Sequence, residues 1–173
     1  VLVAEPLREL FLASVQSKMA GLRIGDPKLA TTQIGPMVSR QQRDRAEALL
    51  KDALAHGGTL LEVDMPEYRP TEAGYFMRPS VVLDPPPSSL IASKEVFGPI
   101  MTVRSFKTDD EAYELANASE YGLAGSVWTT SLERSEAARH RLDVGIVWMN
   151  CVHVLPLSMP VPPHKSSGIG SEF

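Results

Sequence analysis

Apolar side chains at helical spacing predict two amphipathic helices in the first third of the chain. The first follows Pro6, a residue suited to an opening helical turn, and Gly21 ends it. Its core face is predicted to comprise Leu7, Leu10, Phe11, Val15 and Met19. The second begins after Ser39, whose hydroxyl can accept a hydrogen bond from the first turn, and ends before Gly57. Its inward face is predicted to comprise Ala46, Leu49, Leu50, Ala53 and Leu54.

Short apolar runs and helical stretches alternate in the second half of the chain. One helix is predicted from Thr108, which forms a capping box with Glu111, and another from Ser131 through Leu142. Strands are predicted at residues 1–3, 59–63, 81–83, 100–106, 123–129 and 145–149. Strand, helix, strand, helix, strand at these lengths is typical of parallel βαβ crossovers. The predicted fold class is therefore α/β, a parallel sheet with helices on both faces.

The last segment of the chain has a different composition. From Val152 onward it is rich in proline, and serine and glycine follow toward the end. Proline cannot donate a backbone hydrogen bond and interrupts regular structure. We therefore predict two parts, a partial domain over residues 1–150 and an extended Pro/Ser/Gly-rich arm over residues 151–173.

Composition and charge exclude several classes of protein. The 173 residues carry a net charge of −4 with no cluster of Lys and Arg, which argues against nucleic acid as the main partner. No apolar run approaches the roughly 18 residues that a membrane-spanning helix needs, and the first residues do not form a signal peptide. The chain opens abruptly on a strand without an initiator Met, so we expect a trimmed product.

A single cysteine, Cys151, limits the chemistry further. One thiol cannot form an internal disulfide or a cysteine-based zinc site, and it favours a cytoplasmic setting. The histidines are not grouped with Asp or Glu at metal-ligand spacing. We therefore predict no metal site.

Three separated segments resemble motifs of the aldehyde dehydrogenase superfamily. They are Gly25 to Ser39 (GDP, then TxxGPMVS), Ser93 to Pro99 (SKEVFGP), and a third that runs from Asn117 through Tyr121-Gly122-Leu123 to Gly145–Asn150 (GIVWMN). They occur in the family's order, and Lys165 to Gly170 (KSSGIG) follows them. Over almost its whole length, the chain is similar to the C-terminal part of that family's catalytic domain.

The resemblance implies oxidation of an aldehyde to a carboxylic acid. In that family the aldehyde forms a thiohemiacetal on a cysteine, and a hydride passes to NAD or NADP. The nucleophilic cysteine, the general base and the glycine-rich nucleotide-binding half would all precede residue 1. We therefore expect the chain to be inactive alone, with NAD or NADP as its cofactor by resemblance, or none in this form.

Four residues match positions that face the cofactor in the family. Glu95 matches a carboxylate that accepts hydrogen bonds from the nicotinamide-side ribose, a role that suits an ionised acceptor. Phe97 matches an aromatic residue beside the nicotinamide. Gln42 and Arg45, three positions apart on one helical face, match residues that reach toward the cofactor. The alternatives are a surface glutamate, a plain core phenylalanine and a solvated polar face.

Four further residues are candidates for catalysis. Cys151 is the only thiol, and His153 would share a side with it in an extended segment; the alternative is a structural cysteine. His164 lies in the segment Pro160 to Lys165, where PVPP replaces the family's PFGG. Glu172 matches a carboxylate proposed to help move protons in the family.

Three explanations fit the missing nucleophile. The chain can be part of a longer or split enzyme, a truncated relative kept as a binding or assembly module, or a protein recruited to acid/base chemistry through His153, His164 or a carboxylate. We expect a homo-oligomer or a complementing chain as partner, because a half-domain exposes apolar surface. A small-molecule aldehyde is the expected substrate of an active form. Its identity and the choice between NAD and NADP depend on residues outside these 173.

Overall fold

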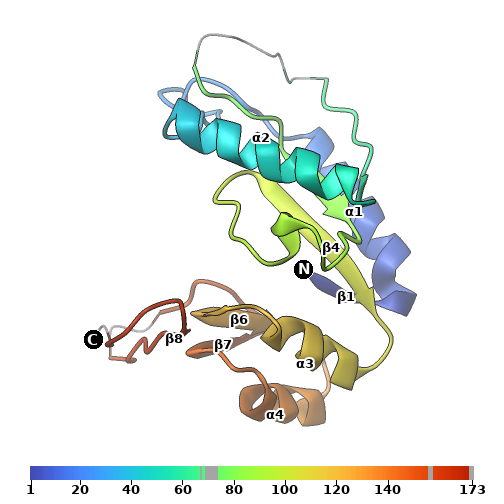
Figure 1. Ribbon diagram of the computed structural model, residues 1–173, viewed down its shortest axis with the longest axis vertical. Helices are drawn as coiled ribbons and strands as arrows, with labels where there is room; N and C mark the ends of the chain where they lie inside the picture. The colour runs from blue at the N-terminus through green and yellow to red at the C-terminus, as the bar shows by residue number, and fades with distance from the viewer. Residues whose placement is uncertain (67, 69–73, 156–157, 172–173) are drawn as a thin grey trace. The chain divides into compact units, whose positions relative to one another are not determined.

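The chain divides into two compact units, Val1–Phe106 and Lys107–Phe173. The computed structural model (Figure 1) describes residues 1–66, 68, 74–155 and 158–171. The predicted boundary after residue 150 stays a prediction. Within the described residues, no helix has the length and apolar character needed to span a membrane.

The first unit is built on a four-stranded sheet in the order β1-β4-β3-β2. Its strands are β1 (Leu2–Ala4), β2 (Thr59–Leu60), β3 (Ser80–Leu83) and β4 (Ile100–Phe106). β4 runs parallel to both of its neighbours, with Val3 opposite Ser105 and Val82 opposite Thr102, and β2 is antiparallel to β3. The predicted parallel sheet is confirmed, while the strand predicted over 59–63 is regular only at 59–60.

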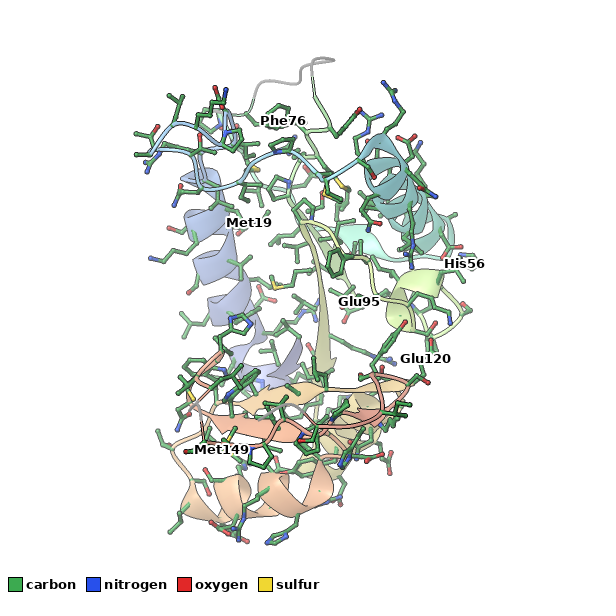
Figure 2. All side chains as sticks on the ribbon, turned by 90° about the vertical axis from the view of Figure 1, so that its left-hand side faces the viewer. Met19, His56, Phe76, Glu95, Glu120 and Met149 are labelled. Carbon is green, nitrogen blue, oxygen red and sulfur yellow. The ribbon has the colours of Figure 1, made fainter. Side chains whose placement is uncertain are left out.

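Helices cover both faces of this sheet, as predicted. Successive side chains of a strand point to opposite faces, so the buried neighbours Val81 and Val82 separate two cores. Val81 belongs to the cluster that contains Leu12 and Met19 of α1 (Arg8–Ala20). Val82 belongs to the cluster that contains Ala53 of α2 (Arg40–Ala55). Figure 2 shows the strands between these two helices.

The predicted core face of α1 is wrong in part. Phe11, Val15 and Met19 pack in the core as expected, together with Leu12, but Leu7 is 56% exposed and Leu10 is 70% exposed. Leu7 lies in a 3-10 turn, η1 (Glu5–Leu7), whose tighter winding breaks the phase of the α-helix. Leu10 lies two residues before Leu12, which places it about 200° away around the helix.

The ends of α2 are those predicted. Ser39 Oγ accepts a hydrogen bond from the backbone N–H of Gln42 at 3.2 Å. The helix ends at Ala55, and Gly57 follows with a φ of 103°, a value that glycine adopts without strain. Of the five residues predicted to face inward, Leu54 is the exception, with 36% of its surface exposed.

The second unit contains one parallel strand pair, β6 (Ala124–Val127) with β7 (Ile146–Met149), joined across α4 (Leu132–Arg141). These strands hydrogen-bond in a sheet of their own, whereas β4 pairs with β1 and β3. The alternating strands and helices therefore form one βαβ crossover within the second unit, from β6 through α4 to β7, and do not form one continuous parallel sheet with β4. The predicted caps are confirmed: Thr108 Oγ1 accepts from Glu111 N before α3 (Asp109–Asn117), and Ser131 Oγ accepts from Arg134 N before α4.

The predicted extended arm is not confirmed. Within its described residues, β8 (His164–Lys165) returns to form an antiparallel pair with β5 (Tyr121–Gly122). The indole N–H of Trp148 also donates to the carbonyl of Val154 at 2.8 Å. The proline-rich segment thus packs against the strands that precede it.

Candidate functional site

The segment Ser93 to Pro99 is attached to the first unit by its apolar residues. It follows a 3-10 turn, η2 (Leu90–Ala92), whose first N–H donates to Asp52 Oδ2 of α2 at 2.7 Å. Ile91 is buried in the core beside α2, and Val96 packs against the same cluster. Because Val96 points inward, its neighbours Glu95 and Phe97 lie on the exposed side of the segment.

Side chains of α2 hold the backbone of this segment. Gln42 Nε2 donates to the carbonyl of Val96 at 3.0 Å and to that of Phe97 at 3.1 Å. Arg45 Nη2 lies 3.4 Å from the carbonyl of Glu95. Three consecutive carbonyls therefore face α2. The structure brings together all four residues predicted at the cofactor, with Gln42 and Arg45 touching the loop that carries Glu95 and Phe97.

Glu95 and Phe97 are both presented to solvent. Within the described part of the chain, the Glu95 carboxylate makes no hydrogen bond or ion pair, so its oxygens can accept from hydroxyl groups of a ligand. Phe97 is 70% exposed and has a φ of 53°, which argues against the alternative of a core phenylalanine. An exposed acceptor beside an exposed ring fits the ribose and nicotinamide of a dinucleotide. Figure 2 labels Glu95.

Cys151 lies at an apolar cavity of about 570 Å³ in the second unit. Its walls include Ile146, Trp148 and Met149 of β7 and Met159 and Pro162 of the tail. Among the described residues, none of the groups that line this cavity is a cation or a base that could activate the thiol for nucleophilic attack. This setting matches that of a structural thiol, and the catalytic role remains a prediction.

The structure does not pair His153 with Cys151. His153 has a φ of 57°, so the segment is not extended at this point and the expected common side is lost. Its ring instead packs edge-on against Trp148, with the ring centroids 5.8 Å apart. No hydrogen bond joins the imidazole to the thiol among the described residues.

His164 contacts a carboxylate that the sequence analysis did not single out. Its Nδ1 lies 3.2 Å from Asp143 Oδ1, and Lys165 Nζ lies 3.3 Å from Asp143 Oδ2. The hydrogen bond from His164, and then that from Lys165, hold the pKa of Asp143 below its ordinary value. All three groups are on the surface, and they join the tail to the turn before β7.

Lys165 and Asn117 belong to the recognised motifs, and their contacts explain why the motifs matter for folding. Lys165 Nζ donates to the carbonyls of Asn117 and Ser119 at the end of α3, at 3.0 and 3.2 Å. Asn117 Nδ2 donates to the carbonyl of Arg141 at the end of α4, and Asn117 Oδ1 accepts from Asp143 N. Lys165 and Asn117 thus connect the ends of α3 and α4 to the segments that follow. In the sequence, only their positions in the family motifs indicated that they matter.

Two predictions remain, one on Glu172 and one on metal binding. Glu172 lies outside the described residues. Among those that the structure describes, no three His, Cys, Asp or Glu side chains come together as metal ligands.

Known proteins resemble this chain from end to end. The model of the aldehyde dehydrogenase family matches residues 1–173. Betaine aldehyde dehydrogenase from Rhizobium etli is 37% identical over 172 residues, covering 99% of this chain and 35% of the relative. The enzyme of that name from Brucella ovis is 36% identical, covering 99% of this chain and 36% of the relative. The chain thus spans about a third of the length of these curated relatives.

Solved structures agree with the sequence matches. The NAD-dependent aldehyde dehydrogenase of Sinorhizobium meliloti superposes with a TM-score of 0.91 at 34% identity, covering 98% of this chain and 33% of that one. Betaine aldehyde dehydrogenase of Staphylococcus aureus, in complex with NAD+, gives a TM-score of 0.89 at 32% identity, covering 98% and 34%. The α/β fold and the matches over the whole sequence lead to one conclusion: the chain belongs to the aldehyde dehydrogenase family.

Proposed function

We propose that this chain forms the nicotinamide-ribose side of an NAD(P)-dependent aldehyde dehydrogenase, and that turnover requires a nucleophile and a base from residues outside it. The observation that carries the proposal is the Glu95 carboxylate, exposed and without a partner in the described chain, on a loop that α2 holds by its backbone. NAD, when bound, supplies the hydride acceptor. Glu95 would hold it by accepting hydrogen bonds from the ribose hydroxyls, and the ring of Phe97 would offer an apolar surface to the nicotinamide.

The second half of the proposal follows from Cys151. It is the only cysteine of the sequence, it lines an apolar cavity, and no base contacts its thiol in the described residues. No described residue at this cavity is a cation or a base that could activate the thiol as a nucleophile. We therefore expect no aldehyde oxidation from the 173 residues alone. One free thiol also favours a cytoplasmic site of action.

Complementation tests the proposal. The chain is co-expressed with the N-terminal two thirds, roughly, of the Rhizobium etli relative, which supply the portion this chain does not match. We expect NADH to form from betaine aldehyde or a simple aliphatic aldehyde, and Glu95→Gln to raise the KM for NAD+ at least tenfold. A complex that assembles and binds NAD+ but forms no NADH with either substrate would overturn the catalytic proposal.

A second candidate is a binding or assembly module without catalysis. Large apolar side chains on the second unit favour it, since Trp128 is 66% exposed and Leu132 is 78% exposed. Contiguous exposed apolar surface commonly marks a protein interface. Sedimentation of the purified chain distinguishes the possibilities: a homo-oligomer or a stoichiometric complex supports the module, whereas a stable monomer that captures no partner contradicts it.

A further inference from the structure

The contact between α2 and the segment around Glu95 depends on two small residues. Gly98 has no side chain, and a Cβ there would lie 3.1 Å from Met37 Cε and 3.3 Å from Ala46 Cβ. Ala46 is fully buried on the face of α2 that meets this segment. Because residues four apart lie one above the other on a helix, Gln42 projects on the same face one turn earlier. The close approach at Gly98 therefore places the Gln42 amide against the backbone just upstream.

The amide of Gln42 is fully engaged as a donor. A primary amide has two N–H groups, and the Nε2 atom contacts two carbonyls, those of Val96 and Phe97, at 3.0 and 3.1 Å. Within the described chain, no other group donates to either carbonyl. Only Oε1 is left to meet a ligand. Gln42 cannot donate to a cofactor without releasing the loop.

Phe97 shows why the loop needs this support. Its φ of 53° is a left-handed conformation that residues other than glycine adopt rarely. Such a conformation persists only when the surroundings fix it. Downstream, the carbonyls of Gly98 and Pro99 are fixed by the N–H groups of Ile100 and Ser80. The carbonyls of residues 95 to 97 depend on α2 instead.

We propose that Gln42 is a positioning residue for cofactor binding: it fixes the backbone of Val96 and Phe97, and through them directs the Glu95 carboxylate toward the ribose. The use of a dinucleotide rests on the function proposed above, whereas the fixing of the loop does not. Gln42 thus acts on the cofactor through Glu95 and not by a hydrogen bond donated to it.

The first measurement tests the fixing of the loop in the chain itself. Trypsin cleaves after Lys94, at the border of this segment. Mass spectrometry of the fragment that starts at Glu95 gives the rate of this cleavage. Cleavage after Lys28, in another loop of the same unit, serves as the internal reference. Gln42→Met keeps the length of the side chain and removes both donors. We expect it to raise the Lys94 rate relative to the Lys28 rate about tenfold, equivalent to about 1.4 kcal/mol.

Matched variants separate this effect from a general loss of stability. Gln41→Met makes the same chemical change one residue earlier, at an exposed position whose side chain makes no hydrogen bond among the described residues, and should leave the ratio unchanged. Gln42→Glu provides a soluble second variant, because an ionised carboxylate has no N–H to donate. It should raise the ratio as Gln42→Met does. An unchanged ratio in both Gln42 variants would overturn the proposal.

The second measurement tests the link to the cofactor, with NAD+ titrated into the complemented enzyme and binding followed by calorimetry. We expect Gln42→Met and Glu95→Gln each to weaken NAD+ binding about tenfold. The double variant should lose far less than the hundredfold expected of independent residues, because Gln42 acts through Glu95. A full hundredfold loss would show that the two residues act separately. If the complemented enzyme binds no NAD+, the proposed function fails, while the proteolysis result still decides whether Gln42 fixes the loop.

Discussion

The tail approaches the chain so closely at Gly145, the residue just before β7, that no side chain fits there. A Cβ on residue 145 would lie 1.7 Å from the carbonyl oxygen of Pro162, 2.8 Å from its carbonyl carbon and 3.2 Å from the carbonyl oxygen of Leu123. All three atoms belong to the backbone, so none can rotate away. We therefore expect Gly145→Ala to push the tail off β7.

The size of the effect follows from these distances. Real Cβ atoms essentially never come closer than 3.0 Å to another heavy atom, so the backbone at Pro162 would have to move by about 1.3 Å. This movement is several times the few tenths of an ångström by which a packed neighbour can shift. Overpacking of this kind costs about 1–3 kcal/mol. The shift also weakens contacts just downstream, among them the two hydrogen bonds from Lys165 Nζ, at about 1 kcal/mol each. We expect the second unit to lose about 3 kcal/mol of its free energy of unfolding.

Tryptophan fluorescence reports on this unit alone, because the two tryptophans of the sequence, Trp128 and Trp148, both lie in it. With a urea m-value of about 2 kcal/mol/M, the midpoint should fall by about 1.5 M. Gly125→Ala is the matched control, since a Cβ at this position on the partner strand meets Leu142 Cδ1 at an ordinary 3.5 Å. Equal midpoints for the two variants would refute the steric argument.

Three other changes probe the contacts described above. Lys165→Met removes both bonds to the end of α3 and should lower the second unit's free energy of unfolding by about 2 kcal/mol, measured by the same fluorescence titration. The pKa of Asp143 lies below its ordinary 3.8. Its contribution to stability is therefore present above that value and is lost as the pH falls through the lowered pKa. The urea midpoint should fall with acidification in that range, and it should fall less steeply in Asp143→Asn. Ser39→Ala removes the cap of α2 and should cost about 1 kcal/mol, measured by circular dichroism.

Features encoded within a few residues were predictable from the sequence. The caps at Ser39, Thr108 and Ser131 each join a hydroxyl to an N–H three residues later, and all three form as expected. The core face of α1 was predicted less well because a 3-10 turn precedes the helix. Periodicity assumes one uniform winding, so the 3-10 turn puts Leu7 out of phase with the α-helix that follows, while Phe11, Val15 and Met19 keep the predicted face.

Contacts between distant residues were not predictable from local patterns. The proline-rich tail contains no periodic signal, so nothing indicated that residues 164–165 pair with residues 121–122. The hydrogen bonds from Gln42 to Val96 and Phe97 join residues more than fifty positions apart. The resemblance to a family brought these residues together as cofactor candidates, but only the structure shows which atoms meet and that the amide of Gln42 is occupied by the loop.

The loop around Glu95 is held by carbonyl oxygens, a group that every amino acid possesses. Its shape therefore depends little on which side chain occupies position 95, whereas position 97, with its φ of 53°, accepts fewer residue types. Substitutions at position 95 can exchange the chemistry presented to a ligand while α2 keeps the backbone in place. A family that accepts different cofactors or substrates can vary such positions one at a time, because each new side chain is displayed on a support that is already folded.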